Sequence, residues 1–202
     1  FKEFENVEKE TEITIKKIMS GNDEYAKQFK VTFYPEFLYS LVRYFDVTRC
    51  LETGVWWGVS SRYFLSAGKK NKQNFILDSI DLPRLDVKNS EKYIGLLVDK
   101  PFLENWNLNI GTDRTYLKKL LRRNQYDMYF FDSDKSLKGK LYLFKAVKKY
   151  QKNYLIIFDD LEDNLFWYRK ELESENKLII KYKAQFFNKQ VDKFIGIIFT
   201  EN

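Results

Sequence analysis

Three aspartates are the residues whose types and spacing point most clearly to chemistry in this 202-residue sequence. Asp132 ends the apolar run "YDMYFFD" (126–132), and Asp159 and Asp160 end the run "YLIIFDD" (154–160). If both runs are adjacent strands, three carboxylates converge at one edge of a sheet. Oxygen ligands without cysteine or histidine are typical of a site for a hard cation, with Mg²⁺ first and Mn²⁺ or Ca²⁺ next. The alternative is that these aspartates cap helices and bind no metal.

A second group of residues forms a glycine loop, "ETGVWWGVSS" (52–61), directly after another apolar run. Gly54 permits a tight turn at the strand end, and Gly58 lets backbone N–H groups at a helix start approach a ligand. Ser60 can add a hydroxyl contact. The spacing is G-x-x-x-G rather than the G-x-G-x-x-G of dinucleotide sites, so a ligand without phosphates fits better. The alternative is a strand–helix turn that holds no ligand.

Two more strand ends carry polar residues. Asp81 in "SIDLP" stands about 20 residues beyond the glycine loop, where a carboxylate can hydrogen-bond both hydroxyls of a ribose. Thr112 and Asp113 in "GTD" (111–113) stand where an adenine edge or amino group would lie. A helix N-cap by either residue explains them equally well. Together with the loop, Asp81 indicates a nucleoside ligand.

The absence of histidine limits the chemistry more than any residue that is present. It excludes Ser-His-Asp triads and HExxH zinc sites, so acid–base chemistry must use Asp, Glu, Lys, Tyr or Cys. Cys50 is the only cysteine, which excludes an intrachain disulfide and fits a reducing compartment. We therefore expect a cytoplasmic protein. No run of about 18 apolar residues occurs, so we expect no membrane-spanning segment.

The net charge of +6 raises the question of nucleic acid binding. The lysines are scattered through every segment and interleaved with acidic residues. This distribution favours a solvated, lysine-rich surface over a dedicated nucleic-acid face.

The elements that must position these residues alternate along the chain. Strands are expected at 47–54, 74–81, 106–111, 126–132 and 154–160, and helices at 59–70, 114–123, 136–151 and near 161–175. The runs 177–184 and 193–200 are expected to pair antiparallel. This order predicts an α/β, Rossmann-like three-layer sandwich whose seven-stranded sheet is mostly parallel. Ligands of such sheets bind beyond the carboxyl ends of the strands, where the polar residues above fall.

Residues 1–46 are expected to be helical, with Pro35 in the first turn of a helix. We expect these N-terminal helices to cover the acceptor site and residues 47–202 to form the catalytic core, both within one structural domain.

The motifs taken together resemble class I S-adenosylmethionine-dependent methyltransferases. The closest likeness is to metal-dependent small-molecule O-methyltransferases of the catechol and macrocin types. The segments that carry the resemblance are "LETGVWWGVSS", "SIDLP", "GLLVDKPFLENWNLNIGTD", "YDMYFFDSDKS" and "LIIFDDLEDN", in family order. The resemblance implies that S-adenosylmethionine is the cofactor and that Mg²⁺, or another hard divalent cation, assists.

The resemblance also implies roles for individual residues. The methionine end of the cofactor would be cradled by Glu52, Gly54, Gly58 and Ser60. Asp81 would hold the ribose.

On the acceptor side, the resemblance implies that Asp132, Asp159 and Asp160 are the metal ligands, with Asp132 also beside the cofactor. For the base, a lysine three residues after the first metal aspartate matches Lys135, and an aspartate two residues after it matches Asp134. Similar sequences read D-S-D-H-S here, so Lys135 stands in place of a histidine. We expect Asp134 to be the base and Lys135 to be a substrate contact or the alternative base.

The sequence therefore predicts metal-assisted O-methylation of a small hydroxylated acceptor such as a sugar, a phenol or a natural product. Two rivals are an RNA methyltransferase, favoured by charge alone, and a non-catalytic domain that keeps the fold. A homodimer is compatible with the sequence.

Overall fold

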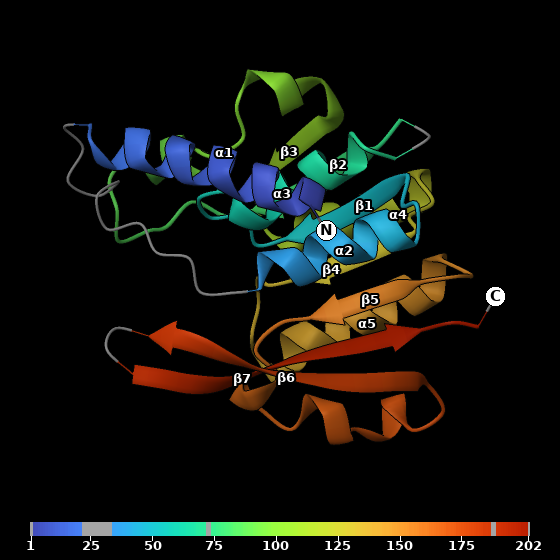
Figure 1. Cartoon of the computed structure of the whole chain (residues 1–202). Helices are drawn as coiled ribbons and strands as arrows, with labels where there is room; N and C mark the ends of the chain where they lie inside the picture. The colour runs from blue at the N-terminus through green and yellow to red at the C-terminus, as the bar shows by residue number, and fades with distance from the viewer. Residues whose placement is uncertain (1, 22–33, 72–73, 187–188, 202) are drawn as a thin grey trace.

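Seven strands form a single sheet in the order β3-β2-β1-β4-β5-β7-β6 (Figure 1). The structure is a computed structural model that describes residues 2–21, 34–71, 74–186 and 189–201. The strands are β1 (Arg49–Thr53), β2 (Ile76–Asp81), β3 (Trp106–Ile110), β4 (Met128–Phe131), β5 (Leu155–Phe158), β6 (Asn176–Phe186) and β7 (Lys189–Phe199). The first five are parallel, β7 runs antiparallel to β5, and β6 pairs antiparallel with β7. The predicted fold class is confirmed.

Helices cover both faces of this sheet (Figure 1). One face packs against α1 (Lys2–Met19), α2 (Pro35–Tyr44) and α3 (Val59–Gly68), and the other against α4 (Asp113–Arg123) and α5 (Leu137–Tyr150). Pro35 opens α2 as predicted, because its fixed backbone angle suits the first turn of a helix.

The strands are apolar on both sides, as a covered parallel sheet requires. Successive residues enter opposite cores: Cys50 lies in the core under α1–α3, and Leu51 lies in the core under α4 and α5. In β4, Phe130 likewise lies in the core under α1–α3 and Phe131 in the core under α4 and α5. A shift of one residue would move each buried side chain of these strands to the opposite face. Burial therefore fixes the register of each strand and the place where the strand ends.

Side chains define the starts of α4 and α5. The hydroxyl of Thr112 accepts a hydrogen bond of 3.2 Å from the backbone N–H of Thr115 at the start of α4. Ser136 does the same for α5, accepting from the N–H of Gly139 at 3.0 Å. These caps fix where the helices begin after β3 and β4.

The helix expected near 161–175 is not formed, so that prediction was wrong. Three short 3₁₀ turns replace it: Leu161–Asp163, Phe166–Tyr168 and Lys170–Leu172. The Asn164 side chain accepts from the N–H of Phe166 at 2.9 Å, which ends the first turn, and Arg169 is extended between the other two. Each turn instead buries its own apolar residue or pair.

Candidate active site

A cavity of about 430 Å³ lies at the carboxyl ends of the parallel strands. Residues of the glycine loop, the end of β2 and the ends of β4 and β5 line it together. The predicted site residues in its wall are Gly54, Asp81, Asp132, Lys135, Asp159 and Asp160. The sheet topology thus brings together residues that lie more than 100 positions apart in the sequence.

Gly54 makes close contact between β1 and β4 feasible. Its φ is +83°, and a Cβ atom there would lie 2.7 Å from the backbone carbonyl of Asp132. Any other residue would combine an unfavourable backbone angle with a backbone clash. Gly58 has a φ of +82°, and a Cβ there would lie 2.7 Å from the Cα of Gly95. The second glycine therefore serves packing against a neighbouring loop, which sequence reasoning did not foresee.

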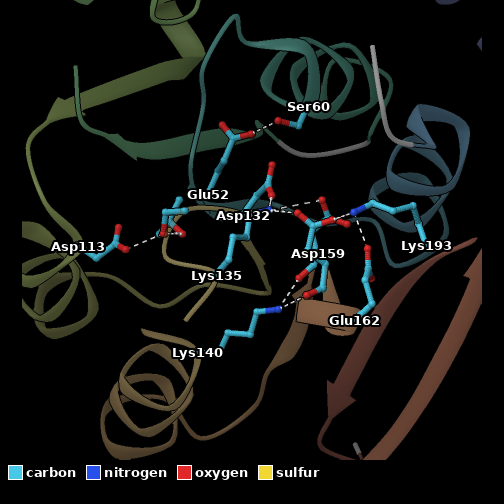
Figure 2. Close-up of polar contacts among 12 residues, drawn as sticks. Glu52, Ser60, Asp113, Asp132, Lys135, Lys140, Asp159, Glu162 and Lys193 are labelled. Carbon is cyan, nitrogen blue, oxygen red and sulfur yellow. Dashed lines mark hydrogen bonds and ion pairs between the residues drawn. The ribbon is translucent and has the colours of Figure 1, made fainter. Parts of the chain in front are cut away.

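Glu52 supports the loop from beneath rather than from the cavity wall. Its side chain is fully buried and accepts a hydrogen bond from the hydroxyl of Ser60 (Figure 2). It also accepts from the hydroxyls of Ser61 and Ser79, the last at 2.8 Å. Burial raises the pKa of Glu52 to about 7, although the serine hydroxyls oppose this effect. Neither Glu52 nor Ser60 lines the cavity, so their direct contact with a cofactor stays a prediction.

Asp81 is fixed by the glycine loop itself. Its carboxylate accepts from the backbone N–H groups of Val55 at 3.0 Å and Trp56 at 2.6 Å, and from its neighbour Leu82 at 2.7 Å. Since these bonds tie the end of β2 to the loop after β1, the loop and the carboxylate form one rigid rim of the cavity.

A second cavity of about 410 Å³ adjoins the first, because Asp81 and Ser133 line both. Thr112, Asp113 and Asp134 also line it. Thr112 is the N-cap of α4, so the capping explanation of "GTD" holds for this residue. Asp113 accepts from the Ser133 hydroxyl at 2.6 Å, and burial raises its pKa.

The predicted aspartates converge. Asp132, Asp159 and Asp160, here named the carboxylate triad, offer ligand atoms within 4.8 Å of one another. Within the part of the chain that the structure describes, Oδ1 of Asp159 is buried and accepts no hydrogen bond. Burial raises the pKa of Asp159.

The ammonium group of Lys135 lies between the members of the carboxylate triad (Figure 2). It contacts Oδ1 of Asp132, lies 2.7 Å from Oδ2 of Asp160, and lies 3.7 Å from Oδ2 of Asp159. Burial alone would raise the pKa of Asp160, but the charge of Lys135 and hydrogen bonds from Lys135 and Lys193 hold it below its usual value.

Two further lysines surround the carboxylate triad, and sequence reasoning missed both. Lys193 of β7 pairs with Asp160 and with Glu162 (Figure 2). Burial would lower the pKa of Lys193, but these two carboxylates raise it. Lys140 of α5 is fully buried, and its ammonium group donates to the backbone carbonyls of Asp159 and Asp160. Burial lowers the pKa of Lys140.

The sequence did contain signals for both lysines. Lys140 falls on the apolar face of its helix, between Leu137 and Phe144 at helical spacing. Lys193 lies at alternate positions with Ile195 and Ile197 along its strand, so its side chain is on the same face of the sheet as these two buried residues. A charged residue at a core position needs a buried partner, which here is the end of β5.

The fit of the carboxylate triad to a divalent metal can be judged from its contacts. The oxygen donors are of the type that Mg²⁺ prefers, and the unpaired oxygen of Asp159 could serve as a ligand. However, the Lys135 ammonium occupies the space between the carboxylates, and both oxygens of Asp160 are paired with lysines. The arrangement therefore fits the ammonium group of Lys135, and Mg²⁺ does not fit between the carboxylates while that group is there.

The two candidate bases face different cavities. Lys135 lines the cavity with the carboxylate triad, whereas Asp134 lines the adjoining one. The Asp134 carboxylate also accepts from the backbone N–H of Ser136 at 3.0 Å, ahead of α5. The geometry thus places Lys135 nearer to the triad than Asp134, although which of them acts as a base stays a prediction.

The two tryptophans of the glycine loop have separate positions. Trp56 lines the 430 Å³ cavity, is 48% exposed, and stacks under the Arg84 guanidinium at 4.8 Å. Trp57 is 5% exposed and packs in the core below α3. Among the described residues, no member of α1 or α2 lines the cavity, and the cover of the acceptor site by residues 1–46 stays a prediction. Residues 22–33 lie outside the described residues.

Comparison with known families gives one match, to the family described as "Methyltransferase domain", over residues 51–161. This stretch runs from β1 to the residue after Asp160 and contains the glycine loop and the carboxylate triad. No curated protein matches the chain.

Solved structures share the fold at low sequence identity. An O-methyltransferase from Bacillus cereus in complex with SAH is 14% identical, with a TM-score of 0.66 over 96% of this chain and 90% of that one. The O-methyltransferase TomG from Streptomyces achromogenes, in complex with SAM, is 18% identical, with a TM-score of 0.60 over 83% and 79%. A putative RNA methyltransferase from Pyrococcus horikoshii is 12% identical, with a TM-score of 0.57 over 96% and 97%. The fold alone therefore leaves the acceptor class open.

Proposed function

Because this chain belongs to the methyltransferase-domain family, we propose that it is an S-adenosylmethionine-dependent enzyme that O-methylates a small hydroxylated acceptor. The acceptor class is a sugar, a phenol or a natural product. The observation that carries the proposal is the single cavity in which the Gly54 loop, Asp81 and the carboxylate triad meet. Cofactor-binding and acceptor-binding groups are thereby within reach of one another, as methyl transfer requires.

The two adjoining cavities suit the two ends of the cofactor. Asp81 stands on the ridge that they share, and its carboxylate would bind the ribose hydroxyls. The adenine would enter the cavity lined by Thr112 and Asp113. The methionine end would lie along the Gly54 loop and Asp132, with Glu52, Gly58 and Ser60 holding that loop in shape.

Methyl transfer forms an oxygen–carbon bond and breaks a carbon–sulfur bond, and the acceptor hydroxyl also gives up its proton. The acceptor oxygen bonds to the methyl carbon, the carbon–sulfur bond breaks with its electron pair moving to sulfur, and the hydroxyl proton leaves to a base. Asp134 and Lys135 are the predicted candidates for that base. The position of Lys135 in the cavity wall favours its contact with the acceptor.

A resident Mg²⁺ on Asp132, Asp159 and Asp160 stays a prediction of the sequence. Its support is the spacing of the three carboxylates, and the Lys135 ammonium between them opposes it.

Ion pairs on the surface support a small acceptor over RNA. Lysines of α5 and β6 pair with acidic neighbours, as in Lys145–Glu171, Lys148–Glu175 and Lys181–Asp192. Such pairs neutralise part of the positive charge of these lysines, whereas RNA binding needs a continuous basic surface. None of the helices in the described ranges combines the length and apolar character needed to cross a membrane. A cytoplasmic location and a homodimer stay predictions.

Calorimetric titration with S-adenosylhomocysteine tests the proposal. Wild-type protein should bind one equivalent, and Asp81→Asn should weaken binding about tenfold or more, because a charged hydrogen bond to the ribose is lost. Asp192→Asn removes an exposed carboxylate on β7 and should leave the affinity unchanged. If the wild-type protein binds no S-adenosylhomocysteine, the proposed function is wrong. Binding with the same affinity in Asp81→Asn would contradict only the role of Asp81.

A further inference from the structure

We propose that the ammonium group of Lys135 is the resident cation of the carboxylate triad, and that it binds the acceptor hydroxyl in place of a divalent metal. The inference rests on the proposed function, because it concerns the acceptor wall of the same cavity. It departs from the Mg²⁺ expected from the sequence.

The first argument is space. Nζ of Lys135 contacts Asp132, lies 2.7 Å from Asp160, and lies 3.7 Å from Asp159. The three carboxylates offer oxygens within 4.8 Å of one another, which leaves room for one cation between them. Mg²⁺ needs its oxygens at about 2.1 Å. It cannot take this position unless Lys135 leaves it.

The second argument is charge. Asp160 has both oxygens paired, one with Lys193 and the other with Lys135. When Lys140 and Glu162 are included, three ammonium groups offset all but one of four carboxylates. The chain itself thus supplies most of the positive charge that a metal would supply. The remaining negative charge complements the positive sulfonium group of the proposed cofactor.

The third argument is that the backbone of Lys135 is held in place. Its carbonyl oxygen accepts a hydrogen bond of 2.6 Å from the Asn164 side chain. The same Asn164 accepts from the N–H of Phe166 at 2.9 Å. The loop that carries Lys135 is therefore bonded to the segment that follows Asp160, which keeps the lysine facing the carboxylate triad.

The remaining exposure of Lys135 gives it a function beyond ion pairing. Its side chain is 31% exposed and lines the cavity, so the ammonium group can donate to an acceptor oxygen while it keeps its carboxylate partners. As the acceptor oxygen bonds to the methyl carbon and the carbon–sulfur pair moves to sulfur, the hydroxyl proton leaves to a base other than Lys135. Lys135 keeps its protons throughout and stabilises the developing negative charge on oxygen.

Metal binding tests the inference without knowledge of the acceptor. MgCl₂ and MnCl₂ are each titrated calorimetrically into the full chain saturated with S-adenosylhomocysteine. Wild-type protein and Lys135→Arg, which both keep a cation between the carboxylates, should show no saturable binding. Lys135→Met should bind one divalent ion with an affinity at least about tenfold above the wild-type limit. Elemental analysis of purified wild-type protein should find no stoichiometric divalent metal.

Lys138→Met is the matched control, because it removes the same charge from an exposed position three residues away. It should behave as wild type. Circular dichroism shows whether each variant is folded, and Lys135→Gln, which also removes the charge, takes the place of Lys135→Met if that variant does not fold. One divalent ion bound per wild-type chain, with an affinity that Lys135→Met does not raise, overturns the inference. That result leaves the proposed function intact, whereas failure of wild-type protein to bind S-adenosylhomocysteine removes the proposed function itself.

Discussion

The buried ammonium group of Lys140 donates a hydrogen bond of 2.9 Å to the main-chain carbonyl oxygen of Asp159. It also donates to the carbonyl of Asp160, whose backbone has the unusual left-handed conformation with φ of 50°. One side chain of α5 therefore holds the backbone that orients two members of the carboxylate triad.

Lys140→Met should destabilise the protein by about 1–3 kcal/mol, because it leaves two buried carbonyl oxygens without their donor. Urea unfolding measures the change in the free energy of unfolding. Lys138→Met on the exposed face of the same helix is expected to change it by less than about 0.5 kcal/mol. Equal losses in both variants would show that Lys140 acts only through the charge of the helix.

Glu52→Gln should flatten the pH dependence of stability. The pKa of Glu52 rises from 4.5 to about 7 on folding, so the folded state holds the proton more tightly than the unfolded state. Its contribution is fully present below pH 4.5 and is lost as the pH rises through 7. The loss amounts to up to about 3 kcal/mol. Urea unfolding between pH 4.5 and 8 should show this decline in wild-type protein and a smaller one in Glu52→Gln. Parallel curves would contradict the prediction.

Gly54→Ala should cost about 1–3 kcal/mol of stability and weaken S-adenosylhomocysteine binding, because the new methyl group meets the Asp132 backbone at a positive φ. Thermal unfolding and calorimetry measure the two effects. Gly21→Ala, two residues after α1, is the control, because Gly21 has no positive φ and a Cβ there would lie 3.2 Å from its nearest neighbour, the Ile18 carbonyl oxygen. A Gly54→Ala protein with wild-type affinity would mean that the loop can move away from β4.

Trp57→Ala should mainly lower the stability of the protein, whereas Trp56→Ala should mainly weaken binding of the acceptor. Trp57 is buried, so its truncation should cost about 3–5 kcal/mol. Trp56 is half exposed and contacts Arg84 through its ring face, so its truncation should cost about 1 kcal/mol or less. Because Trp56 lines the cavity, its loss should raise KM for the acceptor once one is found by screening phenols and sugars for S-adenosylhomocysteine release. Similar destabilisation by both variants would contradict this division.

Asp134→Asn should reduce turnover less than Lys135→Met does. Lys135 lines the cavity with the carboxylate triad, and its loss should lower kcat about 100-fold or more, whereas Asp134 faces the adjoining cavity. The same acceptor screen provides the assay, and S-adenosylhomocysteine affinity is measured alongside. A larger loss in Asp134→Asn, with cofactor affinity kept, would identify Asp134 as the base.

Much of the fold could be predicted because the parallel strands are apolar on both faces and end in polar residues. Asp81 ends β2, Asp132 and Asp159 directly follow β4 and β5, and the order of these strands fixes where the three aspartates meet. The segment after Asp160 could not be predicted as three short turns. Its conformation depends on the Asn164 side chain, which bonds to the distant carbonyl of Lys135.

The sequence predicted which residues gather at the candidate site better than it predicted the contacts that these residues make. The carboxylate triad converges as expected, but two of its partners, Lys140 of α5 and Lys193 of β7, were not predicted. No local pattern links Lys193 to Asp160, since their contact depends on the pairing of β7 with β5. Glu52 likewise reads as a ligand-facing residue from its position at a strand end. Only the structure shows that its carboxylate accepts hydrogen bonds from three serine hydroxyls.

The place of β7 in the sheet has a consequence for the order in which the protein matures. β7 follows β6 in the chain yet lies between β5 and β6, and it carries Lys193 to the carboxylate triad. As the ribosome releases the chain, the glycine loop and all three aspartates emerge before this lysine does. The acidic wall therefore reaches its final charge only after β7 has entered the sheet, so assembly of this part of the site waits for a strand that is synthesised after all three aspartates.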